Sequence, residues 1–152
     1  MNYIPKRDHL SDEEIKDILN NYRKVAVVGI SRDRSKPSHY VPKFLILKKY
    51  EVFPVNPYVD EILGLSSYKD LTEIQDSIDI VDVFRPPEQI PSIVQQALEI
   101  RPKIFWMQEG IRSPEAVHML EKTNIKVIWD RCMMKEHNRL FGSKPLIPLG
   151  KI

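Results

Sequence analysis

The sequence predicts a three-layer, doubly wound α/β fold with a parallel sheet of about five strands. Two patterns carry this prediction. Short apolar, β-branched segments alternate with amphipathic segments of roughly 10–15 residues, which is the spacing of strands joined by crossover helices. The strand segments are apolar on both faces, as in a sheet buried between two helical layers. With 152 residues, 42% of them hydrophobic, we expect a single domain over residues 1–152.

The charge and cysteine content limits the classes of partner and the cellular compartment. The 23 basic and 21 acidic side chains are interspersed along the chain, so we expect neither a nucleic-acid nor a membrane partner. The only cysteine is Cys132, and no histidine or cysteine cluster has the spacing of a structural zinc site, so no disulfide and no metal site are predicted. The first ten residues lack the apolar core of a signal peptide, which indicates a cytoplasmic protein.

The chain begins with a predicted helix, and the strongest strand of the sequence follows it. Ser11 is a typical N-cap because three acidic residues come next, and the N-terminal segment, residues 1–22, is expected to be helical from there to about Tyr22. The segment Val25–Ile30 is almost wholly apolar and predicts a strand buried on both faces. Further strands are expected at Val52–Val55, Ile78–Phe84, Ile104–Met107 and Lys126–Trp129. Further helices are expected at Ser38–Lys49, Ile90–Ile100 and Ser113–Thr123, with a short helical turn at Leu71–Ile74.

Prolines and small residues define the connections. Pro42 falls within a predicted helix, and we expect it to be tolerated because it lies near the first turn. The segment Asp60–Ser67 contains a glycine and is expected to be a connection. The pair Met133 and Met134 indicates a last helix packed on the sheet or an oligomer contact. Residues 142–152 are proline-rich and are expected to form an extended tail.

The strand ends are where a ligand site is expected. In open parallel sheets, ligands bind beyond the carboxyl ends of the strands, near the point where strand order reverses. Each predicted strand is followed by polar or loop-forming residues, as such a site requires. These strand-end segments are Gly29–Ser38, Asn56–Tyr58, Arg85–Pro87, Gln108–Gly110 and Asp130–Cys132.

The loop after the first strand has the features of a phosphate site. A glycine, three serines and the start of a helix supply backbone N–H groups, hydroxyls and a helix dipole, and basic side chains add positive charge. The alternative is a solvated, serine-rich turn in which Ser38 is only a helix cap. The residues concerned are Gly29, Ser31, Arg32, Arg34, Ser35, Lys36 and Ser38.

Two common nucleotide motifs are missing. At the three glycine positions of the Gly-x-Gly-x-x-Gly fingerprint, the sequence has Gly29, Ser31 and Arg34, so only the first glycine is present. The second strand ends in Asn56 and Pro57 rather than in an acid that binds ribose hydroxyls, so ordinary NAD binding is disfavoured. No Gly-x-x-x-x-Gly-Lys-Ser/Thr P-loop occurs. An oxidoreductase that uses NADP or FMN remains an open alternative.

Six sequence blocks at strand ends carry a resemblance to a known family. The chain from about Arg23 to His137 resembles the small stand-alone CoA-binding proteins. It is similar, more distantly, to the CoA-binding domain of the succinyl-CoA synthetase α-subunit and of ADP-forming acyl-CoA synthetases. The blocks are Val25–Ser31, Ser35–Ser38, Val55–Pro57, Val81–Arg85, Trp106–Gly110 and Asp130–Cys132.

The resemblance implies a Rossmann-like domain that binds coenzyme A or acyl-CoA. The first loop would lie along the pyrophosphate and the 3′-phosphate, Asn56 and Pro57 would border the adenosine, and Arg85–Pro87 would line the path of the pantetheine or adenine. Gln108 and Gly110 would lie across the cleft. The site residues that it implies are Gly29, Ile30, Ser31, Arg32, Ser35, Lys36, Ser38, Asn56, Pro57, Arg85, Pro86, Pro87, Gln108, Gly110 and Cys132.

No catalytic motif accompanies this predicted site. No Ser-His-Asp, Cys-His or paired-carboxylate arrangement is legible, so we assign no catalytic residue. The chain ends near the point where the synthetase subunit continues into its phosphohistidine domain, so we expect a binding module, carrier or sensor without ligase chemistry. Cys132 is either an inert, partly buried residue or a thiol able to form a mixed disulfide with CoA. Its neighbour Arg131 would favour the thiolate, whereas burial would oppose it.

Overall fold

A five-stranded, all-parallel sheet forms the centre of the protein. We describe residues 3–142 of a computed structural model. The strand order is β2-β1-β5-β6-β7, which confirms the predicted α/β fold. A separate antiparallel hairpin is formed by β3 and β4. The strands are β1 (Lys24–Val28), β2 (Glu51–Val55), β3 (Glu61–Ile62), β4 (Leu65–Ser66), β5 (Ile80–Val83), β6 (Ile104–Met107) and β7 (Lys126–Ile128).

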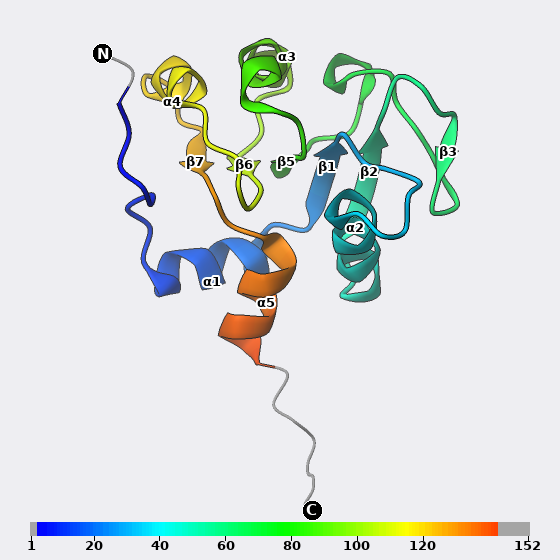
Figure 1. The fold of residues 1–152 in the computed structure, drawn as a ribbon, viewed down its shortest axis with the longest axis horizontal. Coiled ribbons are helices and arrows are strands. Elements are labelled where there is room, and N and C mark those ends of the chain that lie inside the picture. The colour runs from blue at the N-terminus through cyan, green and yellow to red at the C-terminus, as the bar shows by residue number, and fades with distance from the viewer. Residues whose placement is uncertain (1–2, 143–152) are drawn as a thin grey trace, which may run out of the picture.

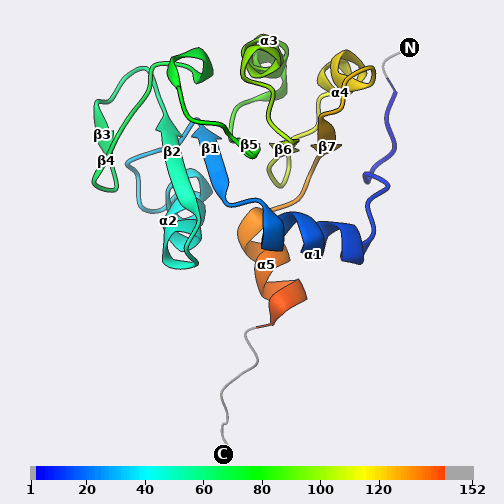
Figure 2. The same ribbon diagram turned by 180° about the vertical axis from the view of Figure 1, so that it is seen from behind.

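Two layers of helices cover the sheet. Figures 1 and 2 show α3 and α4 on one face and α1, α2 and α5 on the other. Side chains alternate along each buried strand, so Ala26 and Val28 pack under α3 and α4, whereas Val25 and Val27 pack under the other three helices. The helices are α1 (Asp12–Asn21), α2 (Pro37–Leu47), α3 (Ile90–Ile100), α4 (Pro114–Leu120) and α5 (Met133–Phe141), with 3₁₀ turns at Leu71–Glu73 and Pro87–Gln89. No helix among residues 3–142 is long and apolar enough to cross a membrane.

Strand order reverses between β1 and β5. From β1 the chain turns to one side through α2 to β2, and it then returns to build β5, β6 and β7 on the other side (Figure 1). The loops after β1 and β5 therefore leave the sheet in opposite directions and open a crevice at its carboxyl edge. This is the position where the sequence predicts a ligand site.

Most predicted elements are confirmed, with shifts of a few residues at their ends. Ser11 caps α1 in a reciprocal capping box with Glu14, and Ser113 caps α4. The expected connection at Asp60–Ser67 contains a hairpin of β3 and β4 that was not predicted. The expected helix around Met133 is present as α5, which packs against α1 and α2. The expected tail at residues 142–152 lies, except for its first residue, outside the described part of the chain.

Pro42 has a different position and role from those predicted. It lies in the second turn of α2 and not near the first. A proline has no N–H, so it leaves the carbonyl of Ser38, four residues earlier, without its usual helical donor. That carbonyl instead accepts a hydrogen bond from the backbone N–H of Ser31, at 3.0 Å. The proline thereby frees the group that attaches the loop after β1 to the start of α2.

Asp82 is a buried carboxyl group in the middle of β5. It has no exposed surface, and neither of its side-chain oxygens has a hydrogen-bond partner among residues 3–142. Its cross-strand neighbours, Val27 and Trp106, belong to the apolar core beneath α1, α2 and α5. Burial therefore raises the pKa of Asp82 well above its ordinary value and favours the protonated form.

We expect Asp82→Val to stabilise the protein at pH 7. Removing an unpaired buried polar group should increase the free energy of unfolding by about 1–3 kcal/mol. Because burial raises the folded-state pKa of Asp82, the contribution of its protonation to stability is complete below the unfolded-state pKa and is lost as pH rises toward the folded-state pKa. The wild-type protein is therefore more strongly penalised by this group at pH 7 than at pH 4. Urea unfolding of both proteins at pH 4 and pH 7 should show a larger gain at pH 7. An equal gain at both pH values would contradict this account.

Candidate functional site

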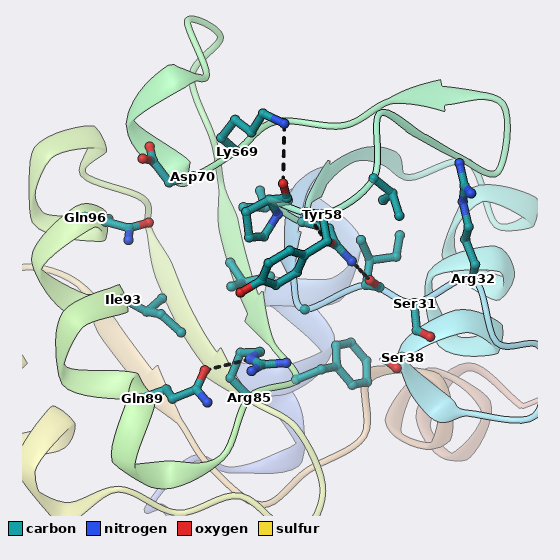
Figure 3. Close-up of a pocket in the computed structure, with 18 of the residues that line it drawn as sticks. Ser31, Arg32, Ser38, Tyr58, Lys69, Asp70, Arg85, Gln89, Ile93 and Gln96 are labelled. Carbon is teal, nitrogen blue, oxygen red and sulfur yellow. Dashed lines mark hydrogen bonds between the residues drawn. The ribbon is translucent and has the colours of Figure 1, made fainter.

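Two adjoining cavities lie at the carboxyl edge of the sheet. The first has a volume of about 690 Å³ and lies between the loop after β1, the end of β2, the loop after β5 and the first turns of α3 (Figure 3). The second has a volume of about 390 Å³ and lies between the start of α2, the ends of β5 and β6, and the start of α5. Lys36, Ser38, Phe84 and Arg85 line both, so the two cavities share a wall.

Gly29 allows the chain to turn tightly at the end of β1. Its φ of +87° lies in the region that glycine adopts without strain. A Cβ at this position would lie 2.6 Å from Cδ of Arg85 and 2.8 Å from the carbonyl oxygen of Phe84. The loops after β1 and β5 can approach each other this closely only because the residue is glycine.

Local hydrogen bonds hold the loop after β1. The backbone N–H of Asp33 donates to Oγ of Ser31, and both the backbone N–H and the hydroxyl of Ser35 donate to Oδ1 of Asp33. The ring nitrogen Nδ1 of His39 lies 2.7 Å from the carbonyl oxygen of Ser31. The amide of Asn56 donates to the carbonyl of Ile30 at 2.8 Å. The serine-rich loop is therefore an ordered structure attached to both α2 and β2.

Ser38 does not cap α2, contrary to the alternative in which this serine is only a helix cap. Lys36 is the N-cap of α2, and Pro37 is its first residue. Ser38 makes no capping bond and lines both cavities instead. The start of α2, with its positive dipole end, thus adjoins both cavities and suits an anionic ligand group.

Positive side chains dominate the charge around the first cavity. Arg32, Lys36, Lys69 and Arg85 line it, against the single carboxylate of Asp70. The guanidinium of Arg32 donates twice to the carbonyl of Glu61 in the β3–β4 hairpin, at 3.2 and 2.9 Å. The missed hairpin therefore positions one of these cations. A ligand with several negative charges fits this cavity better than a neutral or cationic one.

Several lining residues were not predicted from the sequence. Lys69 follows the hairpin, and its Nζ donates to the carbonyl of Pro57 at 3.3 Å (Figure 3). Four others come from the first turns of α3 and its preceding 3₁₀ turn, at the spacing of one helix face. This helical spacing could have indicated the four residues, because the other side of α3 packs against the sheet. They are Gln89, Ser92, Ile93 and Gln96.

The structure brings most of the predicted site residues together. Three lie outside the lining of both cavities: Ser35 faces Asp33, Pro87 begins a 3₁₀ turn, and Gly110 donates its backbone N–H to Asp130 at 2.6 Å. The first cavity is lined by Gly29, Ile30, Ser31, Arg32, Lys36, Ser38, Asn56, Pro57 and Arg85. The second is lined by Lys36, Ser38, Arg85, Pro86, Gln108 and Cys132.

Arg131 pairs with two carboxylates, whereas its sequence neighbour Cys132 lines the second cavity. The Arg131 guanidinium is buried and binds both carboxylate oxygens of Asp8, at 2.8 and 3.0 Å, and Oε1 of Glu136 at 2.7 Å. These two carboxylates, led by Asp8, raise the pKa of Arg131. Its charge is thus used to attach the N-terminal segment to the end of β7. Cys132 itself is buried and is the N-cap of α5.

Comparison with known proteins identifies the family. Residues 23–138 match the family described as CoA binding domain. The chain belongs to this family. It is a Rossmann-like CoA-binding domain, as the resemblance of its six strand-end blocks implied.

Relatives of similar length and fold include proteins without an assigned function. The Bacillus subtilis protein YneT, described as uncharacterized, is 42% identical over 127 residues, covering 84% of this chain and 94% of YneT. A solved structure of a hypothetical protein from Pyrococcus horikoshii OT3 is 36% identical and has a TM-score of 0.88, covering 93% of this chain and 100% of that one. An ADP-forming acetate–CoA ligase of Methanocaldococcus jannaschii is 31% identical over 85 residues. The match covers 56% of this chain but 12% of the ligase.

Proposed function

We propose that the protein binds coenzyme A or an acyl-CoA non-covalently and acts as a binding module, carrier or sensor. The first cavity would take the 3′-phospho-ADP part of CoA, with Lys36 and the start of α2 at the pyrophosphate. Four basic side chains against one carboxylate carry this proposal, because CoA has about four negative charges and charge-assisted hydrogen bonds are the strong ones. The ligases match only over a small part of their length, so ligase chemistry is not included.

The adenosine and the pantetheine arm of CoA would lie against other residues of the two cavities. Asn56 uses its side chain within the protein, bonding Ile30 and the backbone N–H of Tyr58, so it shapes the cavity more than it offers donors. The absence of an acid at this position suits a 3′-phosphate, which a carboxylate would repel. The half-exposed path past Arg85 into the second cavity would take the pantetheine arm.

Thermal unfolding with added ligands tests this proposal against the oxidoreductase alternative. CoA at about 100 times its Kd should stabilise the protein by about 2.7 kcal/mol and raise Tm by several degrees, and NADP at the same concentration should not. Purified protein should be colourless, because bound FMN would make it yellow. A rise in Tm with NADP and none with CoA would contradict the proposal and favour the oxidoreductase.

The reactivity of Cys132 stays a prediction with its own test. Cys132 lines the second cavity, where the pantetheine thiol would lie. In the expected exchange, the Cys132 thiolate attacks one sulfur of CoA disulfide, a Cys132–CoA disulfide forms, and the other half leaves as CoA thiolate. Intact-mass spectrometry after incubation with CoA disulfide should show one CoA adduct that a reductant removes and that Cys132→Ser lacks. Unmodified wild-type protein would show that Cys132 is inert.

A further inference from the structure

Gln108 contributes a hydrogen-bond donor to the second cavity. Gln108 is 2% exposed and lines this cavity. Its Oε1 accepts the backbone N–H of Met133 at 3.1 Å, which fixes the orientation of the amide. Its Nε2 has no hydrogen-bond acceptor among residues 3–142. This amide donor can therefore serve an acceptor atom of a ligand in the cavity.

A second set of donors lies beside this amide. The first-turn N–H groups of a helix have no partners within the helix and form its positive dipole end. In α5, Met134 and Lys135 occupy this first turn, and both line the second cavity. Gln108 and the start of α5 therefore offer donors on the same side of the cavity, as an uncharged carbonyl oxygen requires.

Apolar side chains, the shared cations Lys36 and Arg85, and one surface ion pair complete the cavity. Tyr40, Phe84, Ile111 and Met134 supply apolar lining. At its exposed rim, Nζ of Lys135 lies 2.9 Å from a carboxylate oxygen of Glu109, so this cation is already paired. The cavity volume of about 390 Å³ is near the lower end of the range for small-molecule sites, about 300–1,000 Å³. A short apolar group fits this volume and lining better than a long chain.

We infer that the second cavity binds the thioester end of a short-chain acyl-CoA. This inference rests on the proposed function, because the wall shared through Lys36, Ser38 and Arg85 leads from the nucleotide cavity into this one. Nε2 of Gln108 donates to the thioester carbonyl oxygen, and the apolar lining contacts the acyl chain. The protein thus distinguishes a CoA ester from free CoA.

Calorimetric titration of the full chain with CoA and butyryl-CoA tests the inference. A reductant keeps Cys132 from forming a disulfide during the experiment. Butyryl-CoA should bind about tenfold or more tightly than CoA, because burial of each acyl methylene adds affinity.

Two variants assign the preference to the second cavity. Gln108→Glu keeps an acceptor for the Met133 N–H but removes the donor, so the ratio of butyryl-CoA to CoA affinity should fall several-fold. Ile111→Trp, at a half-exposed position, reduces the space for the acyl chain and should lower the same ratio by a separate route. A wild-type protein that binds CoA and butyryl-CoA equally would overturn this inference and leave the proposed function intact. Binding of neither ligand would overturn both.

Discussion

Asp8→Ala should lower the free energy of unfolding by about 3–5 kcal/mol, because it leaves a buried guanidinium without its main partner. The Arg131 side chain is 8% exposed and that of Asp8 is 2% exposed, and the two form a two-pronged ion pair. The Asp8 carboxylate also accepts the backbone N–H of Trp129 at 3.4 Å. Glu136 remains as a second partner of Arg131, so the loss should fall toward the lower end of this range. Urea unfolding at neutral pH measures it.

Asp60→Ala is the matched control for this prediction. It removes the same carboxylate from an ion pair with Lys69 that is 3.9 Å long and largely exposed. Exposed pairs of this kind contribute about 0–1 kcal/mol, so the control should be nearly neutral. Similar losses in Asp8→Ala and Asp60→Ala would show that the buried pair does not hold the N-terminal segment.

Replacing Lys36 and Arg85 together with alanine should weaken CoA binding about a hundredfold or more. Each lines both cavities, and a charge-assisted hydrogen bond to phosphate contributes about 1.5–3 kcal/mol. Arg85 is already oriented for a ligand, because its Nε donates to Oε1 of Gln89 at 2.9 Å. The fold should tolerate the change, since Lys36 is exposed and Arg85 is half-buried. Calorimetry at fixed salt measures the affinity.

A control with the same loss of charge separates local contacts from the overall field. Lys103 and Lys122 are exposed and lie before β6 and after α4, at the amino-terminal edge of the sheet, opposite the cavities. The double variant Lys103→Ala, Lys122→Ala removes two positive charges without touching the site. An equal loss of CoA affinity in the two double variants would contradict the assignment of Lys36 and Arg85.

The fold was predictable because its signals are local. The apolar segments at Val25–Ile30 and Ile104–Met107, with the capping residues Ser11 and Ser113, mark strands and helix starts within short windows of sequence. The rule that ligands bind at the carboxyl ends of parallel strands then predicted most of the residues that line the cavities. The three outside the cavity lining, Ser35, Pro87 and Gly110, were adjacent to lining residues in sequence, and adjacency does not fix side-chain direction.

The features that were missed depend on distant contacts. The β3–β4 hairpin consists of two-residue strands, too short for a periodic pattern, and Lys69 reaches the site because that hairpin returns the chain to β2. Arg131 was read with its sequence neighbour Cys132, but its partner Asp8 lies 123 positions away. Pro42 leaves the carbonyl of Ser38 free to accept the backbone N–H of Ser31, in the loop after β1. None of these relations is visible until the tertiary structure is known.

Calorimetric titration of the wild-type protein with CoA, dephospho-CoA, NADP and FMN at one salt concentration tests the central claim most directly. The first cavity, with four basic side chains, is expected to bind CoA with a Kd of about micromolar, which corresponds to roughly −8 kcal/mol. Dephospho-CoA should bind more weakly because it lacks the 3′-phosphate, and NADP and FMN should give no heat of binding. Binding of NADP or FMN in the absence of CoA binding would contradict the account.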